Sequence, residues 1–284
     1  MPEPITTPLS GKVCLVTGAS SGIGKAVARE LARLKATVVL ACRSPEKGEA
    51  ARRDIAEATG SHELEVVTAD LSNRRQVREL VEAFARRHPV LHVLVNNAGV
   101  WLERRQESAE GIEKTWATNV LGYFLLTELL LPALKAAPSA RIVNVASRLA
   151  GELDLADVEF KRRAYSGRVA YSQSKQADRM FTWALARRLD GTRVTANALH
   201  PGFVSTELFS KAGGFMGVVA SAYAKLAALK PEQGADTAVW LAASPEVQGQ
   251  HGLFWIERQE RRCRFRDPKG EEALWSLCAE MTAA

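Results

Sequence analysis

Tyr171 and Lys175 lie four residues apart in a segment with helical periodicity, a spacing that places both side chains on the same face of a helix. A fixed ammonium stabilises the phenolate of a neighbouring tyrosine, whose ordinary pKa is about 10, and makes its proton usable near neutrality. Proton transfer to or from a carbonyl or alcohol oxygen needs a group of this kind. Taken alone, the pair favours an exposed ring beside a solvated lysine, because both residues are common in helices, and only the motifs that precede it change this interpretation.

A glycine-rich loop follows the first apolar, β-rich run of the chain, residues 12–17. The loop reads Gly18-Ala-Ser-Ser-Gly22-Ile-Gly24, and a helical pattern over residues 25–34 follows it. Glycines permit a tight turn and let backbone N–H groups approach a pyrophosphate at the N-terminus of a helix. The spacing G-x-x-x-G-x-G differs from the most familiar dinucleotide fingerprint, and a purely structural turn is the alternative. The strand before the loop and the helix after it favour nucleotide binding.

Arg43 follows the next apolar run, residues 37–42, and lies 19 residues after Gly24 (43 − 24). Dinucleotide-binding folds place an acidic residue at about this distance, 20 residues or so, to hold the ribose 2′-hydroxyl. A carboxylate would repel a 2′-phosphate, whereas a guanidinium can bind it in a fork. The sequence therefore favours NADP(H) over NAD(H), with an arginine that merely flanks a strand as the alternative.

Apolar runs alternate with helical patterns along most of the chain. The runs cover residues 12–17, 37–42, 64–69, 90–95, 141–146, 193–199 and 252–257. The helical patterns cover residues 25–34, 46–58, 74–87, 110–136, 169–189, 232–243 and 271–281. Strands that are apolar nearly throughout predict a parallel sheet buried on both faces, so we expect an α/β fold with a doubly wound, Rossmann-type architecture and a mainly parallel sheet.

Polar residues or glycines come directly after the strands, at the edge of the sheet where such folds bind ligands. These residues are Gly18, Arg43, Asp70, Asn97, Ser147 and Gly202. We expect one domain over residues 1–284, with residues 1–10 as an N-terminal tail. Residues 203–230 lack the strand–helix alternation and contain Gly213-Gly214 among apolar side chains. A mobile lid over an apolar substrate and a packed pair of connecting helices both fit this segment.

Composition and charge restrict the classes of partner. The 284 residues carry a net charge of +6, with basic clusters at 161–163 and 261–266 that lack a nucleic-acid motif, so we expect solvated surface and no nucleic-acid partner. The four cysteines are far apart and show no metal-ligand spacing, which favours a reducing compartment and no metal; Cys14 and Cys42 fit small core residues. The proline-containing residues 1–10 have no apolar signal region, and no uninterrupted apolar run approaches about 18 residues. We therefore expect a cytoplasmic protein without an integral membrane segment.

Together, these motifs resemble those of the short-chain dehydrogenase/reductases over about residues 11–283. The shared motifs are Thr17-Gly18-x-x-x-Gly22-x-Gly24, Asn96-Asn97-Ala98-Gly99, Asn119, Ser147, Tyr171-x-x-x-Lys175 and Pro201-Gly202. The chain is most similar to the retinol dehydrogenase-like branch, on the basis of Leu40-Ala41-Cys42-Arg43, Asn119-x-Leu121-Gly122, the 141–147 run R-I-V-N-V-A-S, His200-Pro201-Gly202 and a Ser–Tyr interval of 24 residues (171 − 147). Membrane-bound members of that branch carry an N-terminal anchor helix, which this sequence does not show.

The resemblance implies four catalytic residues. Tyr171 would be the general acid in carbonyl reduction and the base in alcohol oxidation, and Lys175 would lower its pKa and hold the nicotinamide ribose hydroxyls. Ser147 would hydrogen-bond the substrate oxygen. Asn119 would support a water chain that feeds protons through Lys175. Taken singly, Ser147 could instead cap a strand and Asn119 could make a polar contact within a helix.

The resemblance also implies which residues line the cofactor. They are Gly18, Ser20, Ser21, Gly22, Ile23, Gly24, Arg43, Asp70, Leu71, Asn97, Ala98, Gly99, Tyr171, Lys175, Pro201, Gly202, Val204 and Thr206. Asp70 would lie at the adenine, with a helix N-cap as its alternative role, and the loop after Pro201 would lie at the carboxamide.

These residues predict an NADP(H)-dependent oxidoreductase that transfers a hydride between nicotinamide and a carbonyl/alcohol pair. The expected pocket residues Trp101, Leu149, Leu153 and Phe203 are apolar, whereas Arg148 is not, so we expect a lipophilic aldehyde, ketone or alcohol of retinoid, steroid or xenobiotic type. The alternative is a non-catalytic NADP(H)-binding sensor or scaffold. A homodimer or tetramer through helices 110–136 and 168–190, and peripheral membrane binding through the basic C-terminal segment, are both compatible with the sequence.

Overall fold

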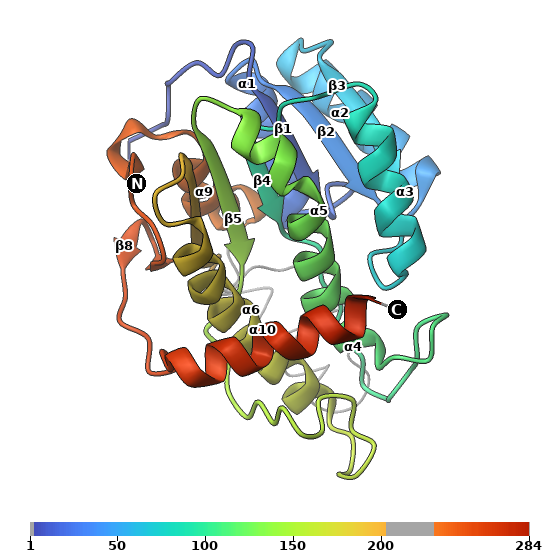
Figure 1. Cartoon of the computed structure of the whole chain (residues 1–284). Helices are drawn as coiled ribbons and strands as arrows, with labels where there is room; N and C mark the ends of the chain where they lie inside the picture. The colour runs from blue at the N-terminus through green and yellow to red at the C-terminus, as the bar shows by residue number, and fades with distance from the viewer. Residues whose placement is uncertain (1–2, 203–229, 284) are drawn as a thin grey trace.

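A computed structural model describes residues 3–202 and 230–283, in which one eight-stranded sheet lies between two layers of helices (Figure 1). The strands follow the order β3-β2-β1-β4-β5-β6-β7-β8. All neighbouring pairs are parallel except β7 and β8. The strands are β1 (Val13–Thr17), β2 (Thr37–Cys42), β3 (Leu64–Thr68), β4 (Val93–Asn96), β5 (Ala140–Val145), β6 (Val194–His200), β7 (Phe254–Ile256) and β8 (Gln259–Glu260). The doubly wound, mainly parallel sheet predicted from the apolar runs is confirmed.

Helices cover both faces of the sheet. The helices α1 (Gly22–Arg33), α2 (Pro45–Thr59) and α9 (Pro231–Ala243) pack on one face, and α3 (Arg74–Ala85), α5 (Gly122–Ala136) and α6 (Gly167–Leu189) pack on the other. The C-terminal helix α10 (Pro268–Ala283) crosses α6 on the outside of that second layer (Figure 1). A single turn, α4 (Lys114–Trp116), leads through a π-helical stretch, Ala117–Leu121, into α5.

Successive residues of each strand point to opposite faces and build two separate cores. Leu15 lies in the core beneath α3, α5 and α6, whereas Cys14 and Val16 lie in the core beneath α1, α2 and α9. Cys14 and Cys42, expected from the sequence to be core residues, are 0% and 2% exposed. Because both faces of these strands are covered, they appear in the sequence as continuous apolar runs.

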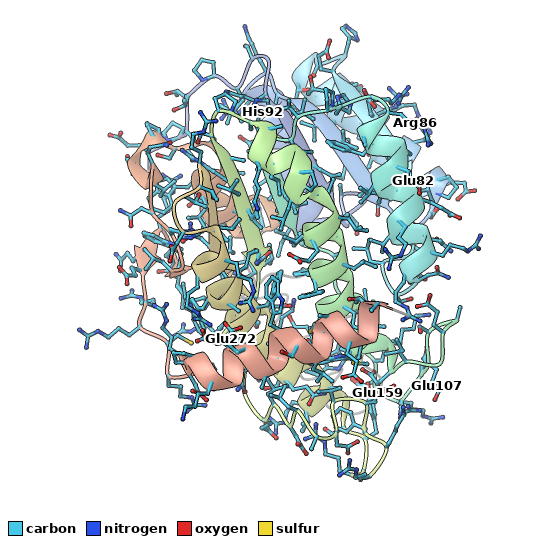
Figure 2. The ribbon with its side chains drawn as sticks, in the orientation of Figure 1. Glu82, Arg86, His92, Glu107, Glu159 and Glu272 are labelled. Atoms are coloured by element: carbon cyan, nitrogen blue, oxygen red, sulfur yellow. The ribbon has the colours of Figure 1, made fainter. Side chains whose placement is uncertain are left out.

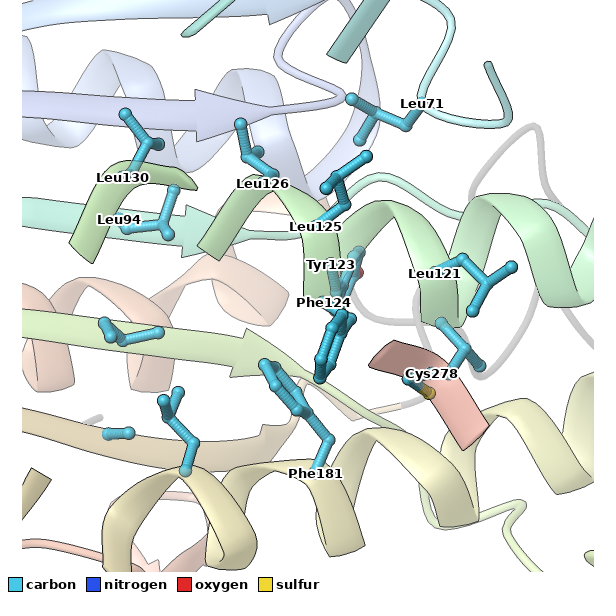
Figure 3. Packing of buried hydrophobic residues seen from close by; sticks show 14 of the residues in the cluster. Leu71, Leu94, Leu121, Tyr123, Phe124, Leu125, Leu126, Leu130, Phe181 and Cys278 are labelled. Carbon is cyan, nitrogen blue, oxygen red and sulfur yellow. The ribbon is translucent and has the colours of Figure 1, made fainter. Parts of the chain in front are cut away.

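An aromatic cluster joins α5, α6 and α10. The ring centroid of Phe124 lies 5.7 Å from that of Phe181 and 4.9 Å from that of Trp275, and the rings of Phe181 and Trp275 stack at 5.8 Å. Figure 3 shows Phe124 of α5 facing Phe181 of α6, with Cys278 of α10 beside them. Aromatic pairs at such separations contribute about 0.5–1.5 kcal/mol each beyond the burial of their area, so this cluster fixes α6 between the sheet and α10.

A buried chain of polar side chains fixes the height of α6 above the sheet. Asn96 of β4 donates to Asn144 of β5 (2.9 Å), and Asn144 donates to the Thr182 hydroxyl of α6 (2.9 Å). Thr182 in turn donates to the backbone carbonyl of Asp178 (2.7 Å). Partners of this kind are required of buried polar groups, and they leave α6 little freedom to slide along the sheet.

Two elements differ from the sequence-based prediction. The helix expected over 110–136 begins only at Lys114, because the Glu113 carboxylate accepts from the backbone N–H groups of Thr115 and Trp116 and so caps the helix. The antiparallel strand β8 was not predicted. It has only two residues, both exposed, and such a strand carries no apolar pattern.

One helical stretch in the described chain, Lys114–Ala136, is long and apolar enough to cross a membrane by length and composition. The sequence-based expectation concerned uninterrupted apolar runs, whereas this stretch reaches the limit only as an average over the helix. The structure buries 72% of the most apolar window inside the protein, as a core helix of a globular fold does.

Gly122 lets the start of α5 pack directly against the loop that follows β3. A Cβ at this position would lie 2.8 Å from the Leu71 carbonyl oxygen and 3.0 Å from the Leu71 Cβ. We expect Gly122→Ala to lower the free energy of unfolding by about 1–2 kcal/mol, since overpacking against backbone outweighs the gain in helix propensity of about 1 kcal/mol. Urea unfolding measures the change.

Gly48→Ala is the matched control, because Gly48 also lies in a helix but its added Cβ would meet the Val66 methyl at 2.7 Å, which can turn away more easily than backbone can move. A Gly122→Ala protein that is as stable as the Gly48→Ala protein would contradict this interpretation of the contact.

Candidate active site

The carboxyl ends of the parallel strands meet at one edge of the sheet, where two long loops gather. Figure 2 shows Glu107 and Glu159 on these neighbouring loops, whereas His92, at the start of β4, lies at the opposite end of the molecule. Arg105 ties the loops together, since its guanidinium donates to the Glu107 carboxylate (2.7 Å) and to the Glu159 carbonyl (2.9 Å). The site residues predicted from the sequence that the structure describes lie at this edge.

The glycine loop forms a close contact between the ends of β1 and β4. Gly18 has a φ of +65°, a conformation that favours glycine, and a Cβ there would lie 2.9 Å from the Ala98 Cα. A Cβ on Gly24 would lie 2.4 Å from both the Asn97 side-chain nitrogen and the Gly18 carbonyl oxygen. The two glycines are therefore required for the loop to pass beneath Asn97 and Ala98.

Thr17 holds this arrangement in place. Its hydroxyl accepts from the backbone N–H groups of Asn97 (2.8 Å) and Ala98 (3.0 Å), and the Asn97 side-chain amide donates to the Thr17 carbonyl (2.8 Å). Gly99 continues the same loop. The Asn-Asn-Ala-Gly segment thus supports the glycine loop and fixes the position of the loop backbone that would face a dinucleotide.

The N-terminus of α1 is open to an anion. Ser21 is the N-cap residue of α1, and its side chain makes no cap hydrogen bond within the described residues, whereas Ser44 and Asn73 cap α2 and α3 with their side chains. Uncapped N–H groups at the start of a helix, together with the helix dipole, favour a phosphate group. Ser20, Gly22 and Ile23 lie in the same loop and first turn, so the geometry fits the pyrophosphate of a dinucleotide.

Arg43 and Asp70 extend the site along the neighbouring strands. Arg43 is exposed directly after β2, the strand next to β1. The Asp70 carboxylate accepts from the Ser72 backbone N–H (2.9 Å) and hydroxyl (2.7 Å), while Asn73 caps the following helix. The alternative role of Asp70 as the N-cap is therefore wrong. Leu71, beside it, is buried against Gly122.

Helix α6 carries the predicted proton-transfer pair on its buried face. Ser166 caps the helix at the Val169 N–H, and the helix then presents Tyr171, Lys175 and Thr182 toward the sheet. Tyr171 is 5% exposed and Lys175 is 4% exposed. The alternative of an exposed ring beside a solvated lysine is therefore wrong.

Lys175 is held by two acceptors. Its Nζ donates to the Val145 carbonyl at the end of β5 (3.0 Å) and to the Asp178 carboxylate (2.7 Å). Burial alone would lower the pKa of Lys175, but the charge of Asp178 and the nearby Tyr123 and Tyr171 hydroxyls outweigh burial and raise it. The ammonium therefore stays protonated inside the protein.

The acidity of Tyr171 differs from the sequence-based expectation. Burial raises the pKa of Tyr171 above its ordinary value, and Asp178 acts in the same direction. Lys175 and a hydrogen bond with Ser147 act to lower the pKa, as expected, but do not outweigh burial. The expectation that the pKa of Tyr171 is lowered overall is therefore wrong: Tyr171 is a neutral phenol at neutral pH.

Asn119 lies within the π-helical stretch and connects two parts of the site. Its carboxamide accepts from the Val100 N–H (2.8 Å) and donates to the Val100 carbonyl (3.1 Å) and the Ser174 hydroxyl (3.0 Å). A Cβ on Gly99 would lie 3.4 Å from the Asn119 side-chain oxygen and 4.0 Å from Lys175 Nζ, so all three groups converge. π-helical turns inside helices often occur at functional sites.

Ser147 follows β5 and faces Tyr171. Its hydroxyl accepts from the Leu149 N–H (3.1 Å), and its hydrogen bond with Tyr171 lowers the pKa of that phenol. The Arg179 guanidinium donates to the Ser147 carbonyl. Trp101 covers the other side of the phenol, with its ring centroid 4.8 Å from that of Tyr171.

The structure therefore brings together Asn119, Ser147, Tyr171 and Lys175, with the glycine loop and the 97–99 segment beside them. Pro201 and Gly202 follow β6 at the same edge. Val204, Thr206, Phe203 and the expected lid, apart from Lys230, lie outside the described residues. Within residues 3–202 and 230–283, no three metal-ligating side chains group together.

Sequence reasoning missed Asp178, the buried partner of Lys175. It lies three residues after Lys175 and seven after Tyr171, a spacing that puts all three on one helix face. The signal was therefore present in the Tyr-x-x-x-Lys-x-x-Asp pattern, but a carboxylate on the apolar face of a helix is hard to tell from one on its solvated edge.

His200, the last residue of β6, is a half-buried hydrogen-bond acceptor for the residue that follows Ser147. Its Nδ1 accepts from the backbone N–H of Arg148 (3.1 Å), which requires a neutral ring. Burial, with smaller effects from the Arg148 and Arg179 charges, lowers the pKa of His200 from 6.5 to about 4. As the pH falls below 6.5 the unfolded chain takes up this proton before the folded protein does, so stability is lost between those two values.

We expect the free energy of unfolding to fall by about 1–2 kcal/mol through this group between about pH 7 and pH 4.5, a figure reduced for its partial exposure to solvent. His200→Asn, which keeps an acceptor for Arg148, should remove that part of the decline in urea unfolding. The exposed His62→Asn variant is the control and should follow the original protein. An unchanged decline in the His200 variant would refute the assignment.

Comparisons with known proteins show the family of the chain. The family model for short chain dehydrogenases matches residues 12–214. Polyprenol dehydrogenase of Mus musculus is 39% identical over 291 aligned positions, which cover 99% of this chain and 87% of the relative. Retinol dehydrogenase 13 of Homo sapiens is 36% identical over 290 positions, which cover 98% of this chain and 86% of the relative.

Solved structures share the fold. A protein of unassigned function from Mycobacterium paratuberculosis superposes with a TM-score of 0.79 at 33% identity and covers 98% of this chain and 96% of its own. L-Sorbose reductase from Gluconobacter frateurii, solved with NADPH and L-sorbose, gives a TM-score of 0.72 at 25% identity, with coverage of 88% of this chain and 96% of its own. The chain therefore belongs to the short-chain dehydrogenase/reductase family, in its retinol dehydrogenase-like branch, and is a dehydrogenase that acts on CH–OH donors.

Proposed function

We propose that this protein interconverts a lipophilic carbonyl compound and its alcohol with NADP(H), and that Tyr171 is the general acid and base. The observation that carries the proposal is the convergence of Tyr171, Ser147 and Lys175 beside the glycine loop. The phenol bonds to the Ser147 hydroxyl, and Lys175 is buried one helical turn away. A proton donor, an oxyanion partner and a fixed cation are the groups that carbonyl reduction requires.

In the proposed reduction, the Ser147 hydroxyl donates a hydrogen bond to the substrate oxygen, which orients the carbonyl carbon and stabilises the negative charge that develops on oxygen. Tyr171 gives its phenolic proton to that oxygen, and Lys175 stabilises the phenolate left behind. When bound, the nicotinamide would supply the hydride. Asn119 fixes the Val100 loop and the Ser174 turn of α6, so that the proton donor keeps its position.

The proposed substrate class rests on the surroundings of Tyr171. The Trp101 indole lies against the phenol ring, and Leu149 and Leu153 are half-buried on the loop after β5. The mouse and human relatives carry the names of a polyprenol and a retinol dehydrogenase, whereas the structural relative from Gluconobacter holds a sugar. Apolar and aromatic walls favour the lipophilic class for this chain.

Replacing Tyr171 with phenylalanine tests the mechanism. We expect Tyr171→Phe to lower kcat for reduction of lipophilic aldehydes and ketones by about a hundred- to ten-thousandfold, the usual contribution of a positioned general acid. NADPH binding should remain, because the ring is kept. Turnover is measured as NADPH oxidation, and NADPH binding as quenching of tryptophan fluorescence.

Tyr165→Phe is the matched control, since Tyr165 also lies near this edge but donates its hydroxyl proton to the Leu102 carbonyl (3.0 Å). Normal turnover in Tyr171→Phe would refute the mechanism. NADPH binding without turnover of any carbonyl compound, in the unaltered protein, would instead support a sensor or scaffold.

The proposed preference for NADP(H) rests on Arg43, whose exposed guanidinium follows β2 where a 2′-phosphate would be held. We expect Arg43→Asp to weaken NADPH binding by about ten- to a hundredfold, since a hydrogen bond to a charged group contributes about 1.5–3 kcal/mol. NADH binding should change little or improve. Competitive fluorescence titration of the two cofactors gives both dissociation constants.

Arg53→Asp is the control for the change of charge, because Arg53 is also exposed and lies on the adjacent helix α2. An NADPH-to-NADH ratio that changes equally in both variants would show that Arg43 does not recognise the phosphate.

We further propose that residues 1–284 form one catalytic domain with the substrate segment at 203–230. Cytoplasmic location and a homodimer or tetramer stay predictions.

A further inference from the structure

Asp178 is a fully buried carboxylate beside the proton-transfer pair. It is 0% exposed, and its Oδ2 accepts from Lys175 Nζ at 2.7 Å. Its other oxygen, Oδ1, has no hydrogen-bond partner among the residues that the structure describes. Burying a carboxylate with a hydrogen bond to only one of its two oxygens costs free energy of folding, so the presence of Asp178 in the site needs a functional explanation.

Stability alone does not explain this ion pair. Buried ion pairs lose much of their attraction to the cost of removing both charges from water, and apolar residues of similar size are often as stable. The turn that carries Asp178 is already fixed by the Thr182 hydroxyl, which donates to the Asp178 backbone carbonyl. The Asp178 side chain is therefore not needed to hold the helix, and its effect falls on Lys175.

Asp178 limits what Lys175 can do in two ways. An ammonium has three N–H donors, and the Asp178 carboxylate and the Val145 carbonyl accept two of them, which points the remaining donor in one direction. The negative charge of Asp178 also cancels much of the positive potential that Lys175 would otherwise exert on Tyr171.

The charged and titratable groups around Asp178 come from three helices. On α6 itself they are Tyr171, Lys175 and Arg179; α5 contributes the buried Tyr123 and α10 the buried Cys278. Figure 3 shows Tyr123 and Cys278 on the side of α5 and α10 that faces α6. Burial, with a smaller contribution from Asp178, raises the pKa of Cys278, and burial also raises the pKa of Tyr123, so both stay neutral. The charges that act on Tyr171 are then those of Lys175 and Asp178, while Arg179 acts on Asp178.

We propose that Asp178 is a positioning residue which orients Lys175 and offsets its charge, and so keeps Tyr171 in the phenol form that carbonyl reduction uses. The inference rests on the proposed function of Tyr171 and goes beyond it, because it gives a second charged residue, Asp178, control over the pH range in which the enzyme reduces or oxidises.

The electrostatic directions agree with this role. Burial raises the pKa of Asp178 to about 6, against the opposing effect of Lys175, so the carboxylate is ionised at neutral pH. Asp178 in turn contributes to the raised pKa of Tyr171. Removing its charge leaves Lys175 uncompensated, which favours the phenolate and lowers the pKa of Tyr171.

Asp178→Asn tests the proposal, because it removes the charge and keeps the shape. In the plot of kcat against pH, we expect the alkaline limb for reduction and the acid limb for oxidation to move to lower pH by about one unit. This shift corresponds to a tenfold change in the phenol-to-phenolate ratio of Tyr171. Asp236→Asn is the matched control: it removes a carboxylate paired with Arg258 at 2.5 Å on α9, and it should leave both limbs in place. Limbs that stay in place in a folded, NADPH-binding Asp178→Asn protein would overturn the proposal.

A second measurement separates this proposal from the function it rests on. The ionisation of Tyr171 can be followed without turnover by its phenolate absorbance. Subtracting the spectrum of the matching protein that also carries Tyr171→Phe leaves the signal of Tyr171 alone. A downward shift of this titration in Asp178→Asn supports the charge role even if no substrate is found, and an unshifted titration overturns it. Should the Asn variant fail to fold, Asp178→Ser, which leaves space for a water beside Lys175, carries the same test with the same two outcomes.

Discussion

The ammonium of Lys175 is the constraint on which the rest of this site depends. A lysine that is 4% exposed must find acceptors inside the protein, and the structure supplies the Val145 carbonyl from the end of β5 and the Asp178 carboxylate from the next turn of α6. To meet both, α6 has to cross the sheet at a fixed height. The asparagine–threonine chain from β4 through β5 to α6 and the aromatic cluster beneath α10 set that height. The core thus fixes the helix, and the helix fixes Tyr171, the proposed proton donor.

The remaining groups reach the site from strands that are far apart in the sequence. Thr17 ties the glycine loop after β1 to the loop after β4, and Asn119 ties the continuation of that second loop to α6. Asn119 lies in a π-helical turn, where the wider coil directs its carboxamide at both Val100 and Ser174. A displacement of any of these loops would therefore move its neighbours. A site built in this way keeps its geometry through the polar side chains of Thr17 and Asn119, and Ser147 and Tyr171 remain for the proposed chemistry.

The amino-acid sequence was sufficient to predict the sheet, the parallel direction of its strands and the gathering of polar residues at one edge. Strands that are covered on both faces appear as apolar runs, and a polar residue or a glycine marks the end of each run. It was also sufficient for the spacing of Tyr171 and Lys175 on one helix face. The net acidity of Tyr171 was not predictable, since it depends on whether burial or the Lys175 charge is the larger effect, and burial is a property of the packed fold. The π-helical turn and β8 carried no recognisable pattern. The position of Asp178 on the helix face of Lys175 could be predicted from its spacing, but its burial could not.

The balance between burial and charge also bears on the direction of the reaction. A general acid for carbonyl reduction must hold its proton at the working pH, and a buried phenol does so because the phenolate is poorly solvated there. In the proposed reduction, the phenolate left after proton transfer needs a nearby cation to persist until it is reprotonated, and Lys175 would be that cation. A fully uncompensated ammonium would ionise Tyr171 too readily, whereas no ammonium would leave the phenolate without support. A cation offset by a buried carboxylate lies between these limits, which is the balance that the proposed reduction requires.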